Sequence, residues 1–161
     1  MAADDVELDP EREAAGAALL DLTDEIGFHA YAAAWVRNRD TDEWHFVLVS
    51  PMVDTRGPRW IFERLLRAFR IRPLPAGISP MQIHVVSPAW ENAIFGAPHG
   101  FRFSIEPQRP SHLIATLKDV VVNDVKVGDG YAAIYRRLPL DKRKRNPAEY
   151  FDRGVRNLEA A

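Results

Sequence analysis

The chain has 161 residues, of which 47% are hydrophobic and 27% are charged, and its formal net charge is −2. This length and balance are typical of a single globular domain with a sizeable core. The sequence contains no cysteine, which excludes disulfides, thiolate zinc sites, iron–sulfur clusters and cysteine nucleophiles.

Two further features bear on where the protein acts. The N-terminus, MAADDVELDP, lacks the basic residues and apolar run of a secretory signal. No stretch approaches the roughly 18 consecutive apolar residues that a membrane-spanning helix needs. We therefore expect a cytoplasmic protein without a membrane partner. The abundance of Ala, Arg, Val and Pro suggests a bacterial source.

The charged residues are sorted by position along the chain. Residues 1–27 hold nine acidic residues against Arg12 alone, a net charge of −8. Residues 56–72 and residues 136–145 each hold six basic residues against one acidic residue, a net charge of +5 in both segments. Such sorting indicates either an anionic partner or an acidic segment that lies on a basic surface of the same molecule.

The first predicted element is an amphipathic helix. Residues 1–8 are expected to fray, and residues 9–161 to form the single domain. Asp9 can cap the helix, Pro10 suits its first position and Gly27 is a natural stop. One face of this helix is apolar at Ala15, Leu19, Leu22 and Ile26. The acidic side then faces solvent or a basic partner.

A strand pair and a second helix follow. Alternating residues over 30–37 and an apolar run over 44–50 predict a hairpin, whose second strand is covered on both faces. Residues 51–56 are expected to form a loop. Gly57-Pro58 then opens a helix that runs through Arg70.

The second half of the chain is predicted to form short strands separated by turns, followed by a helix. Strands are predicted over 82–86, 101–105, 113–122 and 131–136, with a short helix over 88–95 and turns at 123–124 and 128–130. Asn146, Pro147 and Glu149 resemble a capping box at the start of a C-terminal helix over 146–161. The predicted order is α-β-β-α-β-α-β-β-β-α. This indicates an α+β fold with five to six strands, mostly antiparallel, and helices packed on the sheet.

No complete catalytic or cofactor motif is present. The phosphate-binding loops GxxxxGK[ST] and GxGxxG, the zinc motif HExxH and the hydrolase motif GxSxG are all missing. We therefore expect no cofactor and no metal, and a non-enzymatic role is favoured. The alternative is a small hydrolase or nuclease. His45 and His84 lie in different predicted strands and could meet with Asp54, to bind a metal or exchange protons, if those strands are neighbours. Otherwise the two histidines simply fill the rim of the sheet.

The segment from Asp54 to Trp60 is one candidate anion site. It enters a helix N-terminus, whose free N–H groups and positive dipole attract anions, and Arg56 and Arg59 could add charge-assisted bonds. The alternative is an ordinary helix cap made by Asp54 or Thr55. The arginine-lined face of the same helix has a similar pair of interpretations, a nucleic-acid surface with a stacking tryptophan or a solvated helix face.

The run Lys142-Arg143-Lys144-Arg145 is the densest charge in the sequence. It could contact phosphates or steer an acidic partner, or it could be a solvated linker before the last helix. The leading hypothesis is a binding protein whose basic surface engages an anionic partner. Its predicted contact residues are Arg56, Arg59, Trp60, Arg67, Arg70, Lys142, Arg143, Lys144 and Arg145.

A protein partner or self-association is favoured, with nucleic acid as the alternative. Self-association would place the acidic helix of one copy on the arginine-lined helix of the next. The acidic helix could equally cover those arginines within one molecule, in which case the charge sorting would be structural.

Overall fold

The computed structural model describes residues 8–38, 43–90, 103–105, 113–122, 125–144 and 146–161. The helices are α1 (Pro10–Glu25), α2 (Met52–Ile71) and α4 (Pro147–Ala160). The strands are β1 (Ala32–Asn38), β2 (Trp44–Val49), β3 (Ile83–Val86), β4 (Phe103–Ile105), β5 (Leu113–Val122) and β6 (Val125–Arg137). Three short 3-10 turns are η1 (Pro80–Gln82), η2 (Pro88–Trp90) and η3 (Leu140–Lys142).

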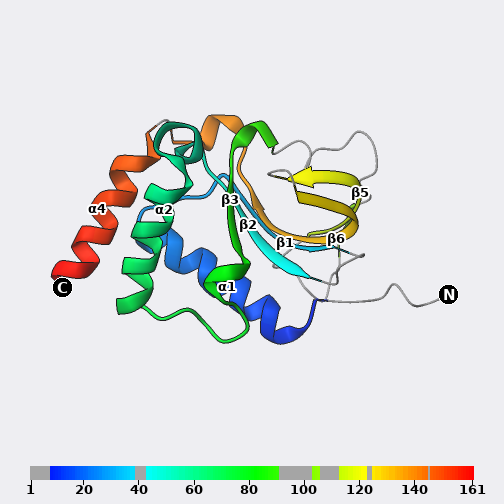
Figure 1. The fold of residues 1–161 in the computed structure, drawn as a ribbon, viewed down its shortest axis with the longest axis horizontal. Helices are drawn as coiled ribbons and strands as arrows, with labels where there is room; N and C mark the ends of the chain where they lie inside the picture. The colour runs from blue at the N-terminus through cyan, green and yellow to red at the C-terminus, as the bar shows by residue number, and fades with distance from the viewer. Residues whose placement is uncertain (1–7, 39–42, 91–102, 106–112, 123–124, 145) are drawn as a thin grey trace.

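The strands form a mixed sheet in the hydrogen-bonded order β3-β2-β1-β6-β5-β4. β2 and β3 run parallel, and the other neighbours are antiparallel. The helices lie together on one side of the sheet, with α4 beside α2 (Figure 1). The main core is therefore a helix-on-sheet interface, in which Trp35, Phe46 and Phe151 are fully buried. Within the described ranges, no helix is long and apolar enough to cross a lipid bilayer.

Helix α1 forms as its sequence predicts. The Asp9 carboxylate accepts a hydrogen bond from the Arg12 N–H at 2.8 Å, and Pro10 is the first helical residue. At the other end Gly27 has φ +83°. Its N–H donates to Asp24 O while the Phe28 N–H donates to Thr23 O, which is a Schellman motif. The four residues of the predicted apolar stripe are all buried.

Two aromatic side chains tie α1 to the sheet. Trp35 Nε1 donates to Arg12 O at 2.8 Å, and Tyr135 Oη donates to Glu13 O at 2.9 Å. The helix can come this close because Gly16 has no side chain. A β-carbon there would lie 2.7 Å from both the Trp35 nitrogen and the Tyr135 oxygen. Because the Trp35 nitrogen and the Tyr135 hydroxyl are both hydrogen-bonded, packing these aromatic side chains against α1 leaves neither polar group unpaired.

Helix α2 begins earlier than predicted, so the expected loop over residues 51–56 is wrong. The Ser50 hydroxyl accepts from the Met52 N–H at 3.2 Å, and the Asp54 N–H donates to Pro51 O at 3.1 Å. These bonds close a helical turn directly after β2. The break falls at Gly57, whose φ of +81° and ψ of +159° are not helical, and the helix resumes at Pro58. The predicted start at Gly57-Pro58 is thus a kink within one longer helix.

Strand β6 also differs from the prediction. It is continuous from Val125 to Arg137, so the turn expected at 128–130 is wrong. Gly128 and Gly130 instead pair with Val120 and Leu117 of β5, at a point where the register shifts. A second shift lies opposite Ala33 and Ala34 of β1.

That second shift lets Tyr135 and Arg136, although consecutive, both reach α1. Tyr135 bonds to Glu13 O, and Arg136 pairs with Asp24. Without the irregularity, consecutive strand residues would point to opposite faces of the sheet.

Helix α4 packs against the end of α1 through backbone contact. A β-carbon at Gly154 would overlap the carbonyl of Ile26, and one at Gly27 would overlap the carbonyl of Tyr150. Phe28 and Phe151 meet edge-to-face beside this contact, with ring centroids 5.1 Å apart. The predicted capping box is wrong. Asn146 makes no side-chain cap bond, because its ψ of 70° departs from the extended conformation of a capping residue.

The predicted α+β class is confirmed. The predicted strand number, the mostly antiparallel pairing and the full element order stay predictions. The short helix expected over 88–95 is a 3-10 turn at Pro88–Trp90, and residues 91–95 lie outside the described residues.

The contact at Gly154 predicts that Gly154→Ala, a type of substitution that usually stabilises a helix, destabilises this protein. In an exposed helix, Gly→Ala stabilises by about 1 kcal/mol. Here Gly154→Ala pushes α4 away from Ile26 O, so we expect it to lower the free energy of unfolding by about 2 kcal/mol or more. Urea unfolding followed by circular dichroism measures the change. Asn157→Ala, at an exposed position of the same helix, is the control and should leave stability within about 0.5 kcal/mol.

Candidate anion-binding site

The basic segment after β6 folds back over Tyr31. The Leu138 N–H donates to Tyr31 O at 2.7 Å, and the Tyr31 hydroxyl donates to the carbonyl of Lys144. Arg143 Nε donates to Leu138 O at 3.0 Å, and its guanidinium lies 4.9 Å from the centre of the Tyr31 ring. These contacts anchor the backbone, so Lys142 and Lys144 project from a fixed loop rather than from a free linker.

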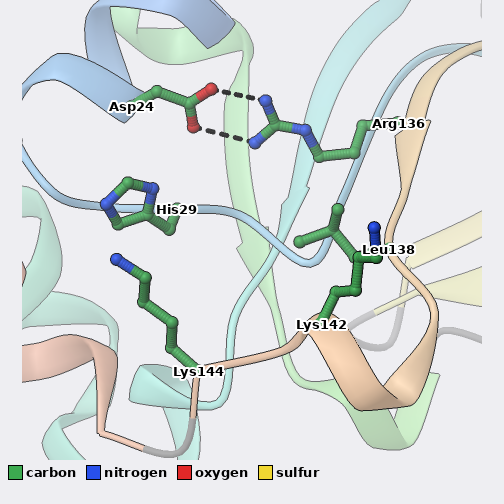
Figure 2. Close-up of a pocket in the computed structure, with 6 residues that line it drawn as sticks. All are labelled: Asp24, His29, Arg136, Leu138, Lys142 and Lys144. Carbon is green, nitrogen blue, oxygen red and sulfur yellow. Dashed lines mark hydrogen bonds and ion pairs between the residues drawn. The ribbon is translucent and has the colours of Figure 1, made fainter.

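Both lysines line a pocket of about 270 Å³ between this loop and the end of α1. The other lining residues are Asp24, His29, Arg136 and Leu138. Figure 2 shows the Lys144 side chain directed toward the His29 ring, while Lys142 rises from η3 beside Leu138. The pocket draws on α1, the α1–β1 connection, β6 and the basic loop, which are distant in sequence.

The pocket carries more positive than negative charge. Asp24 is its one carboxylate, and both of its oxygens bind the Arg136 guanidinium (Figure 2). The side-chain hydrogen bond to Asp24 raises the pKa of Arg136 further above its usual value. Because this pair is internally neutral, the ammonium groups of Lys142 and Lys144 leave the lining with two positive charges. Such a surface suits a carboxylate or a phosphate.

His29 contributes a strained backbone and a titratable ring. Its φ is +49°, and it is the one described non-glycine residue with a positive φ. Strain of this kind costs about 1 kcal/mol or more and concentrates at functional sites. Burial, and then the nearby positive charge of Lys144, lower the pKa of His29. The ring is therefore neutral near pH 7 and gains a proton more readily when an anion enters the pocket.

The predicted residues of α2 do not converge on this pocket. Arg56 lies 5.3 Å from the Trp60 ring centre, and Arg59 pairs with Glu63 at 3.1 Å on the same helix. Trp60 is half-buried between Arg64, 3.7 Å from its ring, and Phe151. Arg70 is exposed. None of these arrangements tests the anion site predicted over residues 54–60, which stays a prediction.

Two arginines of α2 pair with α4 rather than with the acidic α1. Arg64 Nε binds Asp152 Oδ1 at 2.8 Å, and Arg67 binds Glu159. The pKa of Asp152 is lowered, first by its hydrogen bond with Arg64. The acids of α1 act elsewhere. Asp24 pairs with Arg136, and Glu25 reaches only the last arginine of the first basic segment, Arg72, at 3.0 Å.

The alternative catalytic residues meet only in part. His45 and His84 are in direct contact, with His45 Nδ1 2.9 Å from His84 Nε2. Asp54 does not join them. It follows the far end of β2, about 13 Å along the strand from His45, and its carboxylate accepts a hydrogen bond from the Ser87 hydroxyl at 2.7 Å. Among the described residues, no group of three or more His, Asp or Glu is arranged to hold a metal.

Sequence reasoning placed Lys142 and Lys144 in the basic segment but missed His29, Asp24 and Arg136 as their neighbours. The one local signal is that His29 follows a helix-ending glycine. The Asp24–Arg136 pair joins residues 112 apart, which no spacing rule detects. Arg145, also predicted, lies outside the described residues.

The chain matches no known protein-family model, and no curated protein or solved structure is significantly similar to it.

The lowered pKa of His29 predicts how stability changes with pH. Unfolding returns the ring to an ordinary pKa of about 6.5, so the unfolded chain binds the proton more tightly than the folded protein. Stability is therefore greatest above about pH 6.5 and falls as the pH drops toward the folded pKa. His29→Asn, which tolerates the same backbone conformation, should flatten this fall in thermal melts between about pH 7.5 and 5. An unchanged profile would show that His29 does not titrate as described. Burial also lowers the pKa of His84, so some pH dependence should remain in the variant.

Proposed function

We propose that the protein is a non-enzymatic binding protein of the cytoplasm that captures an anionic group of a protein partner in the His29–Lys142–Lys144 pocket. The observation that carries this proposal is the geometry of the pocket. Two lysines and a neutral histidine line a pocket of about 270 Å³ whose single carboxylate is already paired with Arg136. Occupation by a carboxylate or phosphate would neutralise the lysines without displacing an existing ion pair.

The distribution of charge favours a protein partner over nucleic acid. Binding to a nucleic-acid backbone needs a row of basic residues free to neutralise phosphates. Instead, Arg59, Arg64 and Arg67 are each paired with a carboxylate of the same molecule. The pairs with α4 also speak against self-association through the arginine-lined face. The pocket volume suits one anionic side chain rather than an extended strand.

This proposal predicts that binding depends on the two lysines. A poly-glutamate peptide is titrated into the protein by calorimetry at low ionic strength. The double variant Lys142→Gln/Lys144→Gln should weaken the affinity about tenfold, because each lost charge removes part of a charge-assisted contact. Binding by the wild type should also weaken as salt is added.

The matched control removes the same charge from α2. Arg59→Gln/Arg70→Gln alters two exposed arginines outside the pocket and should leave the affinity within about twofold. An equal loss of peptide affinity in both double variants would show that binding depends on overall positive charge, and it would reject the pocket as the binding site. A single-stranded oligonucleotide of the same charge is titrated in parallel. Tighter binding to the oligonucleotide than to the peptide would reverse the choice of partner class.

A further inference from the structure

The starts of β2 and β3 carry a second cluster of polar side chains. In the parallel register Val47 is paired with His84. His45 lies two residues before Val47 and thus on the same face of the sheet. This places His45 Nδ1 2.9 Å from His84 Nε2, at the wall of an open cavity of about 480 Å³. The proposed anion binding does not use this cluster.

The two imidazole nitrogens are at hydrogen-bond distance, and the rings are closer together than a linear hydrogen bond would place them. Rings joined head-on at this nitrogen separation would have centres roughly 5.1 Å apart, because each nitrogen lies about 1.1 Å from its ring centre. The observed centroid separation is 4.6 Å, and the ring planes cross at 84°. At least one nitrogen therefore points away from the line that joins them.

The same separations fit two nitrogens bound to one ion. Imidazole nitrogens coordinate divalent metals at about 2.0–2.1 Å, so a right-angled pair of ligands has its nitrogens about 2.9 Å apart and its ring centres about 4.5 Å apart. A tetrahedral ion would separate the nitrogens by about 3.3 Å. The observed values of 2.9 Å and 4.6 Å fit the right-angled geometry, which is that of tetragonal Cu²⁺ and Ni²⁺ sites.

Glu43 occupies the position of an outer partner. Its Oε2 lies 3.6 Å from His45 Nε2, the ring nitrogen that does not face His84. Metal-bound histidines commonly direct their second nitrogen to a carboxylate, which fixes the tautomer and leaves the first nitrogen free to coordinate.

The positive charge of Arg12, which also borders the cavity, is balanced by an ion pair with Asp9. This guanidinium binds Asp9 at 2.6 Å and lies 5.4 Å from the centre of the Trp44 ring. With two protein donors, the other coordination positions are open to water. A site of this kind has modest affinity and exchanges its metal.

We propose that His45 and His84 form a two-nitrogen site for a divalent transition metal of tetragonal geometry, Cu²⁺ or Ni²⁺, with Glu43 orienting His45. The sequence suggested these two histidines as metal ligands only together with Asp54, which bonds Ser87 instead. The site stands apart from the anion pocket, so the two proposals can fail separately.

The test is calorimetric titration of the full chain with Ni²⁺ and with Zn²⁺. One Ni²⁺ per chain should bind more tightly than Zn²⁺, and His84→Gln or His45→Gln should each weaken Ni²⁺ binding at least tenfold. Glu43→Gln should weaken it about tenfold through the orientation of His45. Cu²⁺ resonance spectra of the wild type should show coupling to two nitrogens.

His29→Asn is the matched control, because it removes a histidine from another part of the described fold and should leave Ni²⁺ binding unchanged. Thermal melts of each variant without metal establish that it is folded. Ni²⁺ affinity in folded His84→Gln equal to that of the wild type would overturn the proposal and leave a hydrogen-bonded histidine pair. Tighter binding of Zn²⁺ than of Ni²⁺ would overturn the tetragonal geometry.

Discussion

The backbone contact between α1 and α4 is the constraint on which the rest of the structure depends. Gly27 ends α1 in a left-handed conformation, and both Gly27 and Gly154 leave room for the opposing main chain. The edge-to-face pair of Phe28 and Phe151 then closes the core beside them. His29 follows Phe28 directly, and Lys144 lies just before α4. Docking the two helices therefore also brings together the groups that line the anion pocket.

Part of the charge sorting in the sequence is resolved by pairing across elements. Asp24 of the acidic helix meets Arg136, while Arg64 and Arg67 of α2 meet Asp152 and Glu159 of the C-terminal helix. The more buried of these pairs, such as Arg64 with Asp152, hold the helices in register, since loss of one partner would leave a poorly solvated charge. The exposed pairs contribute little to stability. Arg59 and Arg70 of α2 remain exposed, and binding is assigned to the basic loop because its two lysines line a pocket.

The features predictable from the sequence were those set by local chemistry. Asp9, Pro10 and Gly27 define α1 because caps and stops act within a few residues. The features that failed depend on distant contacts. At Gly154, helix propensity alone favours alanine, and only the distant contact with Ile26 reverses that preference. The contact of His45 with His84 was conditional on strand order, which the sequence alone does not supply. Asp54 fails to join them although β2 and β3 are neighbours, because it follows the far end of β2 and bonds Ser87 there.

The two proposed sites lie at opposite ends of the strands, which makes them physically independent. Arg136 pairs with Ala33 near the start of β1, whereas His45 pairs with Val36 toward its other end. Between them runs the rigid core of the sheet, where Ala34, Trp35 and Phe46 are fully buried. Substitutions at sites separated in this way and sharing no partner have nearly additive effects. A change in metal affinity caused by Lys144, or in peptide affinity caused by His84, would therefore reveal an energetic coupling that the described contacts do not contain.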